Sequence, residues 1–135
     1  MNNKGLKSVL FVCGDNGFLS QMAEGFARLH GSGKLEVYSA GHHPTEQLDA
    51  KAISLMLERG CDLNSQHLMA INELPDITYD YLILFEPGDE AKEPPARQKE
   101  HWAVPDPSQL APERLTELRD EIEMRVVDLI SRLGD

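Results

Sequence analysis

The chain has 135 residues, of which 41% are apolar, enough for one domain with a buried core over residues 1–135. Its formal net charge of −10, from 13 basic and 23 acidic residues, argues against nucleic-acid binding, which needs clustered basic side chains. No apolar run is long enough to cross a membrane and no signal-peptide pattern begins the chain, so we expect a cytoplasmic protein with no membrane contact. Two cysteines exclude a disulfide scaffold.

The stretch from Val9 to Gly25 combines a short strand, a tight loop and the start of a helix. Its apolar run ends at Cys13, a small polar loop with two glycines occupies residues 14–17, and Ser20 begins a helical pattern. In this arrangement backbone N–H groups and the positive end of the helix point at one spot. A cysteine there is placed to be stabilised as a thiolate. The stretch predicts an oxyanion site with a thiol nucleophile, although a free cysteine is also a common core residue.

The next elements are a helix, a strand and a second helix. The first helix is predicted over residues 21–30, with Ser20 as its N-cap and the segment Gly31–Gly33 as its end. Its apolar stripe consists of Met22, Phe26 and Leu29. Alternating residues predict a strand over 35–39, and the surface turn His42–Pro44 follows. The second helix, over 48–59 with Gly60 as its C-cap, buries Ala52, Leu55 and Met56.

The second half of the chain alternates in the same way. We expect a short helix within 62–74, an apolar strand over 81–85, a surface excursion over 86–99, a short last strand over 102–104, a turn at 106–108 and a long amphipathic helix over 112–133. Strands that alternate with helices indicate an α/β fold with a doubly wound parallel sheet. Ligands of such sheets bind beyond the carboxyl ends of the strands, where Cys13 lies.

The stretch around Cys13 resembles the phosphate-binding loop of low-molecular-weight protein tyrosine phosphatases and the related thioredoxin-coupled arsenate reductases. Their signature is C-x5-R-S after a buried strand; Cys13, Asn16 and Ser20 stand in register with it. The similarity covers nearly the whole chain and includes Gln21–Gly25 (as in the reductase branch), Ser39–Gly41, His101 with Trp102, and Asp106 with Pro107. It implies a three-layer sheet of four parallel strands in the order 2-1-3-4.

The resemblance also implies a role for each site residue. Cys13 would be the nucleophile and Asp106 the general acid, although an Asp-Pro turn is common in any protein. Ser20 would hydrogen-bond the thiolate, although an N-cap role alone would account for it. The oxyanion-binding loop would consist of Gly14, Asp15, Asn16, Gly17, Phe18, Leu19 and Ser20. The ligand would be an oxyanion (phosphate, arsenate or sulfate) or a phosphorylated molecule.

One signature residue differs in a way that bears on the chemistry. Leu19 stands where the family has arginine, and Asp15 stands where it usually has glycine. Arginine meets two oxyanion oxygens at once with a charge that does not titrate away. Loss of one oxyanion donor costs about 10²–10³ in rate, and loss of an arginine in phosphoryl transfer costs roughly 10³–10⁵. We therefore expect weak or no phosphatase or arsenate reductase activity, with Lys51, Arg59 and Arg97 open as substitute cations.

The relay thiols of the arsenate reductases are missing as well. Residues 84–98 hold no cysteine, Phe85 stands about where the first relay thiol would be, and Cys61 lies just after the second helix. We expect no thioredoxin relay, whereas a cycle with an external thiol remains open. Two alternatives are a non-catalytic binding or regulatory module and a thiol redox protein that uses Cys13 with Cys61. The five histidines lack metal-ligand spacing with the cysteines, so no metal or cofactor is expected.

Overall fold

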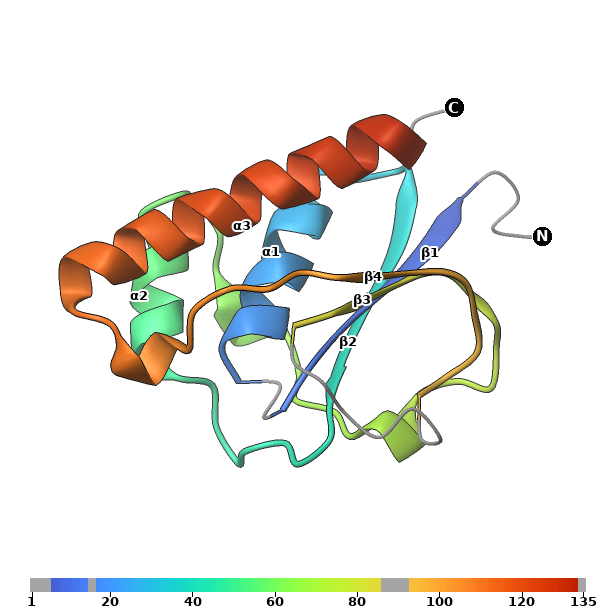
Figure 1. Cartoon of the computed structure of the whole chain (residues 1–135), viewed down its shortest axis with the longest axis horizontal. Coiled ribbons are helices and arrows are strands. Elements are labelled where there is room, and N and C mark those ends of the chain that lie inside the picture. Colours follow the sequence, from blue (N-terminus) through green and yellow to red (C-terminus); the bar gives the residue numbers. More distant parts are fainter. Residues whose placement is uncertain (1–5, 15–16, 86–92, 134–135) are drawn as a thin grey trace.

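A four-stranded parallel sheet forms the centre of the computed structural model, which describes residues 6–14, 17–85 and 93–133 (Figure 1). The strands are β1 (Lys7–Cys13), β2 (Leu35–Gly41), β3 (Tyr79–Leu84) and β4 (Ala96–His101), arranged in the order β2-β1-β3-β4. All three neighbouring pairs are parallel. The α/β class, the four parallel strands and their order are as expected from the sequence.

The α-helices of the described residues are α1 (Leu19–His30), α2 (Ala50–Leu57) and α3 (Pro112–Leu133). The larger core cluster joins their apolar faces to one face of the sheet, with Val9 and Phe11 of β1 at its centre. Figure 1 shows α3 running across α1. On the opposite face a smaller cluster around Leu10, Val12 and Leu82 is covered by the segment that contains Ile71 and Leu74.

The first helix differs from its expected form at both ends. It begins at Leu19, so Ser20 lies inside it, and Phe18 occupies the N-cap position without a side-chain cap. Its last turn is exposed; Leu29, expected on the buried stripe, is 46% exposed, because the buried face ends at Ala27.

The second helix is shorter than expected. It begins after Asp49, whose carboxylate accepts a hydrogen bond from the Lys51 backbone N–H at 2.8 Å. The C-cap is Glu58 rather than Gly60, and Gly60 takes a left-handed φ of 78° two residues later, where a glycine is unstrained. Two 3-10 helices, η1 (Leu63–Ser65) and η2 (Ile71–Glu73), replace the single short helix expected within 62–74.

The last strand was misplaced by the sequence reasoning. It is Ala96–His101, so the end of the expected surface excursion belongs to the sheet; residues 86–92 lie outside the described residues. The error has a physical reason, because this edge strand is largely exposed and its polar sequence has no apolar pattern to reveal it. Trp102 follows the strand: its backbone N–H donates to Leu84 O at 2.8 Å, and its buried ring contacts Phe11 and Phe85.

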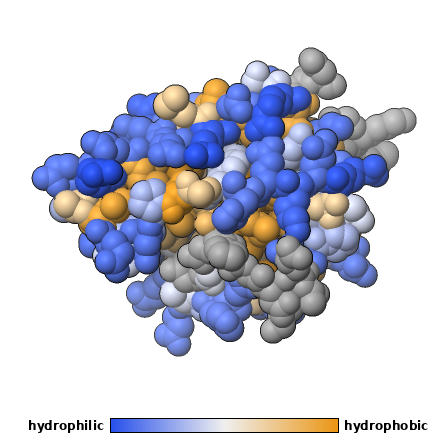
Figure 2. Space-filling model, in the orientation of Figure 1, coloured by the Kyte–Doolittle hydropathy of each residue, from blue (hydrophilic) through white to orange (hydrophobic). Residues whose placement is uncertain are grey.

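The visible surface of the molecule is mainly polar. Hydrophilic residues predominate on the face shown in Figure 2, with apolar residues visible between them. Among the helices of the described residues, none combines the length and the apolar character that crossing a membrane requires.

Candidate functional site

Cys13 ends β1 and meets the first turn of α1. Its side chain is buried, with only 2% of the residue exposed. The Sγ atom lies 2.9 Å from Ser20 Oγ and accepts a hydrogen bond from the Ser20 backbone N–H at 3.4 Å. Because Ser20 lies within the helix, its hydroxyl contacts the cysteine and does not cap the helix. The thiol is therefore held by a helical N–H and a hydroxyl at the carboxyl end of a central strand.

The loop that follows Cys13 is tied to the segment before α2. Gly14 O accepts a hydrogen bond from His43 N–H at 2.8 Å, and Gly17 O accepts one from Asp49 N–H at 3.1 Å. Asp15 and Asn16, the middle of the expected oxyanion loop, lie outside the described residues. The two described ends of the loop are thus fixed to the segment 43–49.

A cavity of about 240 Å³ opens beside the cysteine. Four elements meet around it: the carboxyl end of β1, the starts of α1 and α2, and the 3-10 helix η4 (Pro107–Gln109). Its lining residues are Cys13, Phe18, Leu19, Asp49, Lys51, Asp106, Pro107 and Ser108. The fold therefore brings Cys13 and Asp106, which are far apart in the sequence, to one cavity.

The wall of this cavity is apolar at the position where the family signature has arginine. Leu19 is 4% exposed and Phe18 is 7% exposed, and both belong to the main core cluster. A leucine side chain offers no hydrogen-bond donor and no charge to an oxyanion. Leu19 is thus both a core residue and a wall of the cavity.

Two carboxylates at the cavity are held by local backbone. Asp106 is the N-cap of η4, and its Oδ1 accepts hydrogen bonds from Ser108 N–H at 3.0 Å and Ser108 Oγ at 2.9 Å. Asp49 caps α2 in the same way. The sequence reasoning missed Asp49 and Ser108 as cavity residues. An aspartate just before a helical pattern is a typical N-cap, so the cap at Asp49 could have been predicted from the sequence. The proximity of Asp49 to Cys13 depends on the fold.

Of the three basic residues left open by the sequence, one lines this cavity. Lys51, in the first turn of α2, is that residue. Arg59 donates to both oxygens of Glu123, at 2.9 and 3.1 Å. Arg97 Nε lies 3.4 Å from Asp80 Oδ1. The tertiary structure therefore separates candidates that sequence spacing could not.

Cys61 follows α2 and packs against a different part of α1 from the one that Cys13 contacts. A methyl group added at Gly25 would lie 2.9 Å from Cys61 Sγ, so this thiol packs against the middle of the helix. Ser20, which contacts Cys13, precedes Gly25 by five residues, about 7.5 Å along a helix axis. Neither cysteine is part of a disulfide among the described residues, and burial raises the pKa of Cys61, with a further rise from the neighbouring Asp62 carboxylate. This arrangement gives no support to a Cys13–Cys61 redox pair.

One of the two histidines after β2 is less exposed than the sequence predicts. His43 is exposed, but His42 is half-buried and its buried Nε2 has no hydrogen-bond partner among the described residues. Within the same part of the chain, no group of three or more His, Cys, Asp or Glu side chains is arranged to hold a metal ion.

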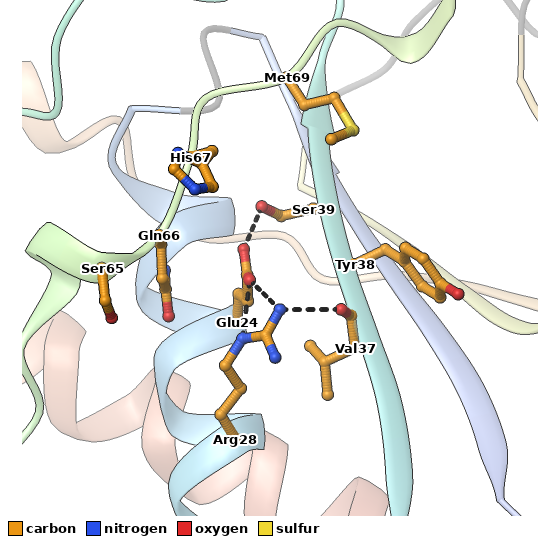
Figure 3. Close-up of a pocket in the computed structure, with 9 residues that line it drawn as sticks. All are labelled: Glu24, Arg28, Val37, Tyr38, Ser39, Ser65, Gln66, His67 and Met69. Atoms are coloured by element: carbon orange, nitrogen blue, oxygen red, sulfur yellow. Dashed lines mark hydrogen bonds and ion pairs between the residues drawn. The ribbon is translucent and has the colours of Figure 1, made fainter. Parts of the chain in front are cut away.

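A second cavity, of about 330 Å³, lies between α1, β2 and the segment 65–69 (Figure 3). The Glu24 carboxylate accepts hydrogen bonds from Ser39 Oγ at 2.5 Å and from Arg28 Nε at 2.8 Å. Arg28 Nη2 also donates to Val37 O at 3.2 Å, while the Tyr38 ring points away from the cavity. These contacts join α1 to β2. Because the Glu24 and Arg28 side chains already bind each other and β2, their charges are balanced without a ligand in the cavity.

Comparison with known proteins relates this geometry to one family. The family model of low molecular weight phosphotyrosine protein phosphatase matches residues 8–135. The glutaredoxin arsenate reductase of Synechocystis sp. is 34% identical over 133 residues, covering 96% of this chain and 100% of that protein. An arsenate reductase of Bacillus licheniformis is 36% identical over 107 residues, covering 76% and 75% of the two chains. A solved arsenate reductase in the phosphate binding state superposes with a TM-score of 0.85 at 31% identity, covering 95% and 99%.

Proposed function

The chain belongs to the low molecular weight phosphotyrosine protein phosphatase family, and we propose that it is a member with a degenerate oxyanion pocket and weak or no turnover of phosphate esters or arsenate. The observation that carries this proposal is Leu19, a buried apolar side chain in the wall of the Cys13 cavity. Two relatives of the chain are named arsenate reductases, so any remaining activity would be arsenate reduction.

Within this proposal the site residues keep the roles that the family resemblance implies. Cys13 Sγ attacks phosphorus or arsenic, Ser20 stabilises the thiolate, and Asp106 gives a proton to the leaving oxygen. The loop of residues 14–20 cradles the oxyanion with its backbone N–H groups. The placement of Cys13, Ser20 and Asp106 supports this division of roles. Residues 1–135 would form one domain.

Arsenate reduction would need a second thiol from outside the chain. After an As–S bond forms at Cys13, a thiolate must attack that sulfur, forming a disulfide while arsenic leaves with the electron pair as arsenite. Cys61 is the only other cysteine in the sequence, and it packs against Gly25 away from the cavity. We therefore propose an external thiol rather than an internal relay to thioredoxin. A reducing compartment such as the cytoplasm would keep Cys13 available.

A non-catalytic binding module is the second candidate. The cavity, the buried thiol and the Asp106 turn are retained although the wall at Leu19 is apolar. Such a protein would bind an oxyanion or a phosphorylated molecule at Cys13 without turning it over. It differs from the first candidate only in having no Cys13-dependent rate.

Hydrolysis of p-nitrophenyl phosphate tests the proposal. We expect negligible turnover in the wild type and a gain of roughly 10³-fold or more in Leu19→Arg combined with Asp15→Gly, because a fixed bidentate cation returns to the cavity and a negative charge leaves the loop. Leu19→Gln with Asp15→Gly is the matched control, since glutamine is polar but uncharged. Cys13→Ser, made in the wild type and in the gain-of-function variant, identifies the rate that depends on the thiol.

The outcomes separate the candidates. A robust wild-type rate that disappears in Cys13→Ser would contradict the proposal of weak turnover. A wild-type rate equal to that of Cys13→Ser would favour the non-catalytic binding module. A small but Cys13-dependent rate would favour a weak enzyme.

A further inference from the structure

We propose that the Lys51 ammonium is the positive charge of the Cys13 cavity and that it holds one oxygen of a tetrahedral oxyanion, a role that Leu19 does not perform. The inference rests on the proposed function in taking the cavity to be an oxyanion pocket. It assigns to a residue of α2 a task that the family signature places in the loop after the cysteine.

Two hydrogen bonds fix the backbone at Lys51, and one of them connects the start of α2 to the cysteine loop. Asp49 N–H donates to Gly17 O at 3.1 Å, which ties the start of the helix to the loop. The Asp49 carboxylate in turn accepts a hydrogen bond from Lys51 N–H at 2.8 Å. The backbone that carries Lys51 is therefore coupled directly to the loop that follows Cys13.

The Lys51 ammonium is available for a ligand. Throughout the described ranges 6–14, 17–85 and 93–133, it forms no ion pair, and the residue is exposed while it lines the cavity. Arg59 and Arg97, the other two candidates, pair with Glu123 and Asp80 instead. An oxyanion beside Cys13 thus meets Lys51 without first breaking an existing ion pair.

The charge balance of the cavity limits what Lys51 can achieve. Among the described residues that line the cavity, Asp49 and Asp106 place two carboxylates beside one ammonium. An ammonium is a point charge on a flexible stem, whereas a guanidinium grips two oxygens in a fixed plane. We therefore expect weak binding of a small oxyanion by Lys51 in the Cys13 cavity, without the orientation that fast transfer requires.

Protection of Cys13 from alkylation measures this binding without any turnover. The protein is treated with iodoacetamide in rising concentrations of inorganic phosphate or arsenate at constant ionic strength, and modification is read at the Cys13 peptide by mass spectrometry. We expect the wild type to be protected and Lys51→Ala to need roughly 10- to 100-fold more anion for half-protection, the range for loss of a hydrogen bond to a charged group. Lys51→Arg should retain protection.

Lys34→Ala is the matched control. It removes the same charge at an exposed position just before β2, at the opposite end of that strand from Gly41. In this variant the anion should protect Cys13 as well as it does in the wild type. Circular dichroism and urea unfolding establish that Lys51→Ala remains folded. Equal protection in the wild type and Lys51→Ala would overturn the inference, and so would the absence of protection in the wild type. Robust p-nitrophenyl phosphate hydrolysis would instead overturn the proposed weak turnover and leave the protection result to decide Lys51.

Discussion

Ser20 lies inside α1, yet its side chain serves the cysteine that precedes the helix. Its hydroxyl is 2.9 Å from Cys13 Sγ, and the same residue also donates its backbone N–H to the sulfur. A hydrogen bond donated to the ionised form of an acid favours ionisation, so the backbone N–H, and the hydroxyl when it donates to the sulfur, favour a thiolate. The residue is fully buried, which keeps water from replacing the hydroxyl.

Removal of the Ser20 hydroxyl should slow the reaction of Cys13 with iodoacetamide. At neutral pH we expect Ser20→Ala to lower the alkylation rate by roughly three- to tenfold, since one hydrogen bond to the thiolate is lost while the backbone N–H remains. The rate at Cys61 in the same sample is an internal reference, and Ser54→Ala on the exposed side of α2 is the control variant. An unchanged Cys13 rate would mean that the hydroxyl does not stabilise the thiolate.

At the scale of elements, α1 packs closely against the segment after α2 because Gly25 has no side chain. A Cβ at this position would lie 2.9 Å from Cys61 Sγ and 3.0 Å from carbon atoms of Leu63 and Met56. The first distance is shorter than real contacts show and the other two are tight, so these three side-chain ends would have to shift within a packed core. Ser20 lies on the same helix, five residues before Gly25, so a shift of α1 would also move the residue that contacts Cys13.

Gly25→Ala should therefore destabilise the protein although alanine is the better helix former. We expect a loss of about 1–3 kcal/mol in the free energy of unfolding, because overpacking outweighs the roughly 0.5–1 kcal/mol of helix propensity gained. Urea unfolding measures the change. In Cys61→Ala the closest atom is absent, so the same Gly25→Ala change should cost less in that background. An equal or greater cost there would show that Cys61 is not the limiting contact.

At the scale of the whole molecule, one carboxylate joins the ends of two helices to α3. Glu123 of α3 lies 2.7 Å from His30 Nε2 at the end of α1, and it accepts two hydrogen bonds from Arg59 just after α2. Burial alone would raise the pKa of Glu123, but the hydrogen bonds from Arg59 and His30 outweigh it and hold the pKa below the ordinary value of 4.5. The charged carboxylate is therefore better stabilised in the folded state than in the unfolded one.

This shift predicts a pH-dependent contribution to stability. A lowered folded-state pKa gives stability that is present above about pH 4.5 and is lost as the pH falls through the folded-state value. We expect Glu123→Gln to cost about 1–2 kcal/mol at pH 7 and progressively less below pH 4.5, as measured by urea unfolding across this range. Glu121→Gln, which breaks an exposed pair with Arg125, is the control and should change little. A cost for Glu123→Gln that did not depend on pH would contradict the proposed ion pairing.

Local pattern in the sequence was sufficient for the elements that bury apolar faces. The apolar run before Cys13 predicts a buried strand, and the spacing of apolar residues over 112–133 predicts an amphipathic helix. Both predictions agree with the structure. The edge strand Ala96–His101 was not predictable in this way, because its polar residues carry no burial pattern and its place is set by pairing with β3. For this reason the sequence predicts the last strand at 102–104, whereas the structure has it at Ala96–His101.

For the candidate site, the sequence alone determined that a cysteine follows a buried strand, that a small polar loop comes next and that arginine is absent at position 19. Only the tertiary structure decided that Lys51, rather than Arg59 or Arg97, lines the cavity, and that the Ser20 hydroxyl contacts Cys13 instead of capping α1. The physical reason is the range of the interactions. Helix and strand patterns arise between neighbours in the chain, whereas the partner of a side chain depends on which distant segments the fold brings together.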